Sequence, residues 1–520
     1  MKNKYIGKAM KISCLISLAA VMLTGCTSDF EKINNPGESA SSTDLSIDNY
    51  QIGSFLVQLE NNAFPEQENA YQMNMDLIGN YLGRYLTYSN NGFTNKNFAR
   101  FNAPDGWVRY PFSDMTPKVV SAFNEIKRLS TKEDLNYNWA LILRTYAMLS
   151  LTDKYGPFPM GLNANNPKAY NSQKDIYISL FQDLDTSIKF LEGFVVANQG
   201  KKFNAEFDKI YNGDFSKWLK FANSLKLRMA IRIRFAEPEI AKKYGEEAVK
   251  SGVMTSNDDN CLITYVPSGL YKTSVEWGDS RACGDIDAYM NGYKDPRIEK
   301  YFKPASKAVE DRKIVGCLAG ANVGDKKIAT ALYSAANVEE TSRGVWMTLA
   351  EVYFCKAEGA LAGWTGMGGS VEELYNQGVK ASFDQWGAGN ADEYLKNTTN
   401  KPNSYKDAEG GYGQNMPASS SITIKWSSTD SPEVQMERLI TQKWIAMYPN
   451  GQEAWNEIRR TGYPKVFDIP TSKNGYTLLV PNRIPFDNEE KVKNPTNYTE
   501  AVKLLGGADD YGTKMWWQKK

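Results

Sequence analysis

The fold is decided by a stretch near the C-terminus that reads Arg438-Leu439-Ile440-Thr441-Gln442-Lys443-Trp444-Ile445-Ala446 and continues as Asn450-Gly451-Gln452-Glu453-Ala454-Trp455-Asn456-Glu457-Ile458-Arg459-Arg460-Thr461-Gly462-Tyr463-Pro464. Ser431 before Pro432 predicts the start of a helix that runs to about Tyr448, because serine is a favoured N-cap and proline suits the first helical position. A second short helix is predicted from Gln452 to Arg460, with glycine and proline as stop signals. The tryptophans of both helices fall on apolar stripes and should fill gaps between helices.

Helical patterning continues upstream of this stretch, mostly in pairs. Helices are predicted over 48–63 and 69–88, over 113–130 and 134–154, over 172–192 with Ser172 and Asp175 at capping-box spacing, and over 214–235 around Trp218; an apolar stripe runs from Trp346 to Trp364. Helix pairs joined by short turns predict a mainly α fold with a tetratricopeptide-like helix-pair scaffold, although no strict internal repeat is visible.

Three long irregular stretches interrupt the helices, at about 89–112, 254–343 and 388–430, and are rich in Gly, Asn, Ser and Pro. They predict loop-rich insertions between the helices. Alternating runs at 261–266 and 421–426 predict minor short strands within them. Loops of this length on a compact body are more often functional than idle, so a ligand site is expected there.

The chain of 520 residues contains no histidine. This excludes Ser-His-Asp and Cys-His catalytic units, His-ligated zinc and imidazole acid–base chemistry. Glycoside hydrolysis by two carboxylates needs acids that converge across ~5–10 Å, whereas acids that are adjacent on a helix point apart. The pairs in question are Asp183 with Asp185, Glu246 with Glu247, and Asp258 with Asp259. We therefore predict a binding protein with no enzymatic activity and no cofactor, and a carboxylate-dependent hydrolase is the enzymatic alternative.

Cysteine spacing does not indicate a metal site, because Cys261, Cys283, Cys317 and Cys355 are scattered without a CxxC motif. One or two disulfides are allowed in an oxidising compartment, and their connectivity stays open. The acidic segment 256–260 offers oxygen ligands for calcium but lacks the glycine and distal glutamate of an EF-hand loop, so a turn is predicted.

The N-terminus has the pattern of an export signal. Four lysines and no acid precede an apolar run from Ile12 to Leu23, too short to span a bilayer. Leu23-Thr24-Gly25-Cys26 resembles the lipobox of bacterial lipoproteins. We predict a signal peptide over 1–25, lipidation at Cys26, a tether over 26–43 and one domain over 44–520. The alternative is an ordinary secretory signal in which the cysteine is incidental.

The charge balance does not indicate nucleic acid or an anionic membrane surface as a partner. The chain has 61 basic and 60 acidic residues, and loss of the four signal lysines leaves 57 against 60. Apart from the signal, no apolar run is long enough for a transmembrane helix. The expected contact with the membrane is therefore the lipid at Cys26 alone.

The stretch at 438–464 closely resembles the signature of SusD/RagB-type outer-membrane lipoproteins, best of all their second subfamily. Segments that agree in order are 29–34, Tyr211-Asn212-Gly213-Asp214 with 217–228, Asp295-Pro296-Arg297, 350–354, 356–358, Arg483-Ile484-Pro485-Phe486 and Trp516-Trp517. Gln518 departs from the acid expected after the paired tryptophans. The resemblance implies a helical fold on tetratricopeptide-like repeats with an irregular loop-rich lobe. It implies a lipoprotein on the outer membrane that faces the cell exterior. It also implies that the protein lies as a lid on a SusC-like TonB-dependent barrel transporter, and that it captures an oligosaccharide or sometimes a peptide without catalysis.

Ligand contacts vary within such a family, so candidate residues come from the loops of this chain. We expect exposed aromatics beside amides, because flat rings cover the apolar face of a sugar and polar side chains bond its hydroxyls. The first predicted cluster is Tyr85, Tyr88, Asn90, Asn91, Phe93 and Trp107, and the second is Trp277, Asp279 and Arg281. A packing role is the alternative for Trp107. Peptide is the alternative ligand.

Overall fold

The computed structural model describes residues 50–65 and 67–520. The predicted signal peptide, the lipidation site Cys26 and the tether to residue 43 lie outside the described residues. Residues Ser54–Lys520 form one compact unit, which contains the elements described here apart from the first residues of α4 (Tyr50–Ala63).

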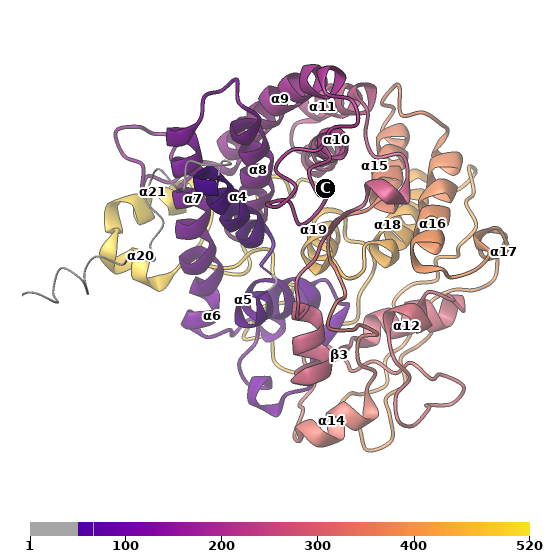
Figure 1. Cartoon of the computed structure of the whole chain (residues 1–520). Coiled ribbons are helices and arrows are strands. Elements are labelled where there is room, and N and C mark those ends of the chain that lie inside the picture. The colour runs from indigo at the N-terminus through magenta and orange to yellow at the C-terminus, as the bar shows by residue number, and fades with distance from the viewer. Residues whose placement is uncertain (1–49, 66) are drawn as a thin grey trace, which may run out of the picture. The chain divides into compact units, whose positions relative to one another are not determined.

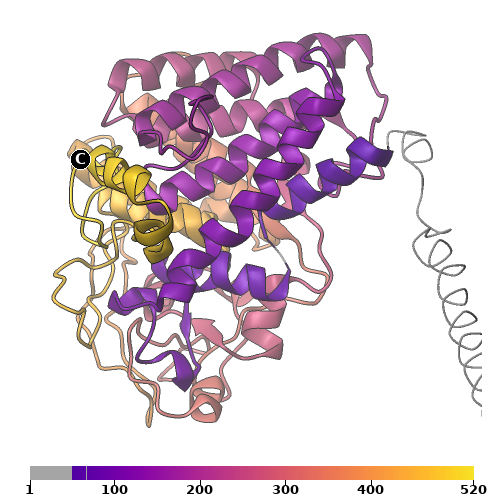
Figure 2. The same cartoon turned by 90° about the vertical axis from the view of Figure 1, so that its left-hand side faces the viewer.

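Long helices that pack against their neighbours in the sequence build the scaffold (Figure 1). They are α7 (Thr116–Leu129), α8 (Leu135–Tyr155), α9 (Gln173–Ala197), α10 (Phe215–Ile233), α11 (Pro238–Ser251), α15 (Leu349–Leu361), α16 (Val371–Trp386), α18 (Pro432–Ala446) and α19 (Gly451–Thr461). Figure 2 shows these helices gathered in the upper part of the view, with short elements and long connections below. The predicted mainly α fold of tetratricopeptide-like helix pairs is confirmed.

Local capping explains several helix ends. The Ser172 hydroxyl accepts a hydrogen bond from the Asp175 amide at 3.1 Å, as its capping-box spacing predicts. Ser431 caps α18 with Pro432 in the first position. At the end of α19, Gly462 has a φ of +81°, a left-handed conformation that glycine adopts without strain.

Tryptophans fill the gaps between helices, as predicted. Trp218, Trp444 and Trp455 are fully buried. The ring of Trp218 lies 5.6 Å from that of Trp139 on α8, and the Trp444 indole donates to the Gly83 carbonyl at 2.8 Å. Trp218 and Trp444 therefore each connect two segments that are distant in sequence.

The loop-rich lobe combines short helices with two antiparallel strand pairs. The strands are β1 (Leu86–Tyr88) with β3 (Ser280–Ala282), and β2 (Cys261–Ile263) with β4 (Gly344–Met347). Its helices and turns include α5 (Glu68–Tyr71), η2 (Gln72–Asn80), η3 (Asn91–Phe93), η4 (Phe98–Arg100), α6 (Asp105–Tyr110), η5 (Pro111–Met115), η6 (Asn257–Asp259), η7 (Tyr271–Glu276), α12 (Gly284–Tyr293), α13 (Ile298–Tyr301), α14 (Lys326–Leu332) and α17 (Ala391–Leu395). Near the C-terminus follow α20 (Asn488–Lys493) and α21 (Pro495–Leu505).

Three sequence predictions need correction. The helix expected over 69–88 ends early, because Arg84 takes a φ of +64° and residues 86–88 pair as strand β1. Residues 421–426 form no strand; instead the carbonyls of Ile422 and Ile424 accept hydrogen bonds from tyrosines on α12 and α16. Trp346 belongs to strand β4 and precedes helix α15. Among the described residues, no helix is long and apolar enough to cross a membrane.

Candidate ligand-binding face

Strands β1 and β3 bring the two predicted clusters together. Their antiparallel register places Leu86 opposite Ala282 and Tyr88 opposite Ser280. Just beyond these two paired strands, called the β1–β3 ribbon below, the Asn90 amide donates to the Asp279 carboxylate at 2.9 Å. Side chains that are 189 positions apart in sequence thus bond directly.

Asp279 is the centre of this arrangement. Besides Asn90, its carboxylate accepts a hydrogen bond from Gln72 of η2 at 2.9 Å and pairs with Lys326 of α14 at 2.5 Å. Sequence reasoning missed Gln72 and Lys326, because both reach Asp279 only through the fold. The one local signal is Asp325, which caps α14 and fixes where that helix begins.

Arg281 forms hydrogen bonds with the backbone next to and within strand β3. Arg281 as a whole is 7% exposed, and its guanidinium donates to the carbonyls of Ser274 and Ser280 at 2.6 and 2.9 Å. Burial lowers the pKa of Arg281 to about 10, which the nearby charge of Asp279 partly opposes. Its hydrogen bonds stabilise the backbone of η7 and β3.

The expected exposure of Tyr85 and Tyr88 is wrong. Both side chains are buried, because β1 runs against the helical core. The Tyr85 hydroxyl donates to the Trp444 carbonyl, and that of Tyr88 donates to the Ala321 carbonyl at 2.6 Å. These tyrosines therefore anchor the ribbon.

The other predicted residues lie at or near the surface. Asn91 is exposed, while Phe93, Trp107 and Trp277 are half-buried. Phe93 meets the Trp107 ring edge-on at 5.1 Å, and the Lys272 ammonium lies 5.7 Å from the Trp277 ring centre. We use the name loop face for Asn90, Asn91, Phe93, Trp107, Trp277 and Asp279. Their role in ligand binding stays a prediction.

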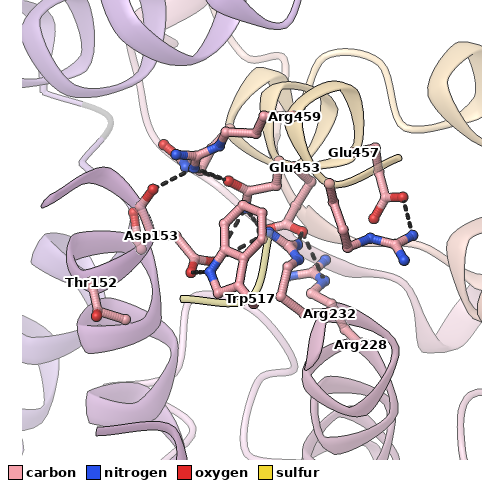
Figure 3. Close-up of polar contacts among 12 residues, drawn as sticks. Thr152, Asp153, Arg228, Arg232, Glu453, Glu457, Arg459 and Trp517 are labelled. Carbon is pink, nitrogen blue, oxygen red and sulfur yellow. Dashed lines mark hydrogen bonds and ion pairs between the residues drawn. The ribbon is translucent and has the colours of Figure 1, made fainter. Parts of the chain in front are cut away.

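A second polar cluster lies inside the helical scaffold (Figure 3). Arg232 pairs with Asp153 at 3.2 Å and with Glu453, and the Trp517 indole donates to Asp153 at 2.9 Å. Arg228 pairs with Glu351 at 2.6 Å. All these side chains are buried, and each acid has an arginine partner, so the cluster stabilises helix packing and is out of reach of a substrate.

Signature residues of α19 extend this network. Arg460 binds Glu358 of α15 at 2.6 Å and Glu457 of its own helix at 2.5 Å. Burial alone would raise the pKa of Glu358, but the charges of Arg460 and Arg234 hold it below its ordinary value. The stretch at 438–464 thus contributes charged side chains that pair in the core.

The four cysteines of the described chain, Cys261, Cys283, Cys317 and Cys355, are free and buried. No group of three or more Cys, Asp or Glu side chains that could hold a metal ion occurs among the described residues. Segment 256–260 contains the 3-10 turn η6, where the Asp259 carboxylate accepts hydrogen bonds from the backbone amides of Thr255 at 2.9 Å and Ser256 at 3.1 Å and pairs with Lys220 at 2.9 Å.

The described chain is therefore a mainly helical protein on a tetratricopeptide-like helix-pair scaffold, with a charge-paired core and a loop-rich lobe. The chain belongs to the SusD-like family, described as "Susd and RagB outer membrane lipoprotein", whose pattern matches residues 32–518. A SusD homologue from Bacteroides thetaiotaomicron is 34% identical with a TM-score of 0.85, and the match covers 91% of this chain and 100% of that one.

Two further solved structures show the same fold. A SusD homologue from Bacteroides uniformis is 34% identical, with a TM-score of 0.84 and coverage of 91% and 100%. A chitin-binding SusD homologue from Flavobacterium johnsoniae is 33% identical, with a TM-score of 0.83 and coverage of 90% and 98%. A search of curated proteins finds no match.

Proposed function

We propose that this protein captures an oligosaccharide at the loop face and delivers it to a SusC-like TonB-dependent barrel transporter, on which it lies as a lid. The observation that carries the proposal is the meeting of two aromatic and amide clusters at Asp279, from loops that the sequence separates widely. A site assembled from several loops and held by one carboxylate presents its side chains in a fixed arrangement.

The chemistry of the loop face suits a sugar. Trp277 and Trp107 offer planar rings that are partly exposed, and Asn91 offers an amide to hydroxyl groups. The chitin-binding homologue from Flavobacterium johnsoniae supports a glycan as ligand. Peptide is the competing ligand, and binding measurements separate the two.

Calorimetry of the full chain in detergent, with a panel of glycan hexamers and of short peptides, tests the ligand class. Trp277→Ala and Asn91→Ala should weaken glycan binding about tenfold or more, the loss of one stacked ring or hydrogen bond in a binding site. Tyr353→Ala is a matched control, because Tyr353 is also half-buried beside a lysine, at 5.3 Å, but lies on scaffold helix α15. Tight peptide binding without a glycan response would exclude the sugar.

The lid role requires a partner in the outer membrane. Lipid at Cys26 would keep the protein at the membrane, and the tether predicted over 26–43 would let it move over a barrel. Affinity purification of the protein from detergent-solubilised outer membranes should recover a large barrel protein with it. Repeated recovery of this protein alone would contradict the lid role.

A further inference from the structure

A separate hollow of 380 Å³ lies next to the loop face. Tyr71 lines the hollow, while the next residue, Gln72, bonds Asp279 of the loop face. Leu270 also lines it, and η7 leads from there to Trp277. Its volume is in the range of small-ligand sites and suits one or two sugar rings.

Four aromatic side chains from different segments line this hollow: Phe64, Tyr71, Trp386 and Tyr448. Trp386, at the end of α16, is half-buried, and its ring is packed edge-on against Tyr301 at 4.7 Å and tilted against Tyr448 at 6.1 Å. These contacts hold the ring in place before any ligand arrives, which lowers the entropy lost on binding.

Two buried polar atoms of lining residues have no hydrogen-bond partner in the described chain: the Gln385 side-chain oxygen and the Trp386 indole N–H. Leaving such atoms unpaired costs about 1–3 kcal/mol each, and native proteins seldom do so without a reason. One atom is an acceptor and the other a donor. A ligand group that offers both an N–H and a C=O would satisfy them together.

The charged lining residues favour a neutral ligand. Arg343 and Asp384 both line the hollow and are exposed, and neither forms an ion pair or a side-chain hydrogen bond with another described residue. Their opposite charges balance, so the hollow selects neither an anion nor a cation. A guanidinium and a carboxylate there can serve the accepting and donating sides of sugar hydroxyls.

We propose that this hollow is a second subsite that binds a 2-acetamido sugar unit, with its ring against Trp386 and its acetamido group between Gln385 and the Trp386 indole. The acetamido N–H can donate to the Gln385 oxygen, and the acetamido C=O can accept from the Trp386 indole N–H. The inference rests on the proposed capture of a glycan and adds the class of sugar unit.

Chitobiose and cellobiose test the subsite, because they differ in the acetamido groups. With the full chain in detergent, calorimetry should show chitobiose binding at least about tenfold tighter than cellobiose. Trp386→Phe keeps an aromatic ring but removes the indole N–H, and Gln385→Ala removes the acceptor; each should weaken chitobiose binding about tenfold. Arg128→Ala, an exposed pair partner of Glu125 on α7, is the control and should leave binding unchanged.

Each alternative outcome overturns the subsite in a recognisable way. Equal binding of both disaccharides would contradict the acetamido assignment, and tighter binding of diglycine than of chitobiose would contradict a sugar ligand.

Other outcomes separate the subsite from the proposed function. Chitobiose binding that depends on Trp277 but not on Trp386 or Gln385 would support the proposed function and contradict this subsite. If chitobiose fails to bind while a longer glycan binds through Trp277, the subsite alone is wrong. If no glycan of the panel binds, the proposed function fails as well. Removing a buried atom that lacks a partner should not lower the melting temperature, so the melting curves of both variants check that a loss of chitobiose binding does not come from unfolding.

Discussion

At the scale of single residues, Asp76 is a carboxyl group buried beneath the β1–β3 ribbon. Ser280 and Asn80 donate hydrogen bonds to it, the latter at 3.1 Å. Burial nevertheless raises the pKa of Asp76 to about 7. The charge state of one side chain beneath the loop face therefore changes within the physiological pH range.

Asp76→Asn should make the protein more stable, by up to about 4 kcal/mol at pH 9 and by only about 1–2 kcal/mol at pH 5. Since the pKa is about 7 in the folded chain and about 3.9 in the unfolded chain, the folded state binds more protons between these values. Stability therefore falls as pH rises through this window, by up to about 4 kcal/mol. Urea unfolding of both proteins at pH 5, 7 and 9 measures the difference. Asp311→Asn, at an exposed carboxylate, is the control; an equal effect of both substitutions at every pH would contradict the assignment.

Glu358→Gln should destabilise the protein by about 3–5 kcal/mol, because it leaves the buried Arg460 and the half-buried Arg234 without a full counter-charge. The matched control is Glu125→Gln, which breaks the exposed pair with Arg128 on α7 and should change stability by less than ~1 kcal/mol. Thermal and denaturant unfolding measure both. Similar effects of the two substitutions would mean that the buried network contributes no more than a surface pair.

At the scale of elements, η2 and α19 approach each other through glycines. A Cβ atom on Gly451 would lie 2.3 Å from the backbone nitrogen of Asn80, and one on Gly79 would lie 2.9 Å from that of Gln452. Because backbone atoms cannot move aside as a flexible side chain can, the two elements meet this closely only without side chains. The contact connects the family signature to the segment that leads into β1.

Gly451→Ala should therefore force η2 away from α19 and destabilise the protein by about 1–3 kcal/mol. Gly193→Ala on α9 is the matched control: an added Cβ there meets nothing within 4 Å, and alanine is the better helix former. The control should stabilise the protein by about 1 kcal/mol. Opposite shifts in the melting temperature are expected, and a stabilising Gly451→Ala would contradict the close approach.

Elements with strong local signals could be predicted from the sequence, and those fixed by distant contacts could not. Helices α8, α9, α10 and α18 follow from apolar stripes and caps. Strand β1 lies within residues of helical periodicity, and only pairing with β3, nearly two hundred residues later, selects the strand. Helix α16, absent from the predicted helices, does carry a local signal, because Ser370 and Glu373 form a capping box.

At the scale of the whole molecule, we predict that attachment to the membrane and affinity for the glycan are independent of each other. Cys26→Ala should abolish retention of the protein in the membrane fraction and weaken glycan capture by whole cells, because the lipid maintains a high local concentration at the membrane. Its affinity for the same glycan, measured by calorimetry on the purified full chain, should equal that of the lipidated protein. Continued membrane retention of the variant would show that another segment provides the attachment.

The candidate site was only partly predictable at this scale. Residue type and loop position pointed to Asn90, Asn91, Trp277 and Asp279, and the fold brings Asn90 and Asp279 within hydrogen-bond distance. Local sequence could not show that Tyr85 and Tyr88 face the core, nor that Lys326 completes the arrangement around Asp279. Burial and long-range pairing are properties of the assembled chain.

The buried pairs of α10, α15 and α19 also have an evolutionary consequence. A change to one partner of Glu358 and Arg460 leaves an unmatched charge in the core, so two simultaneous changes are needed to replace the pair without an unstable intermediate. Exposed positions such as Asn91 and Arg343 carry no such constraint. Descendants of this chain can therefore acquire new ligand preferences by single mutations in the lobe while the scaffold stays the same.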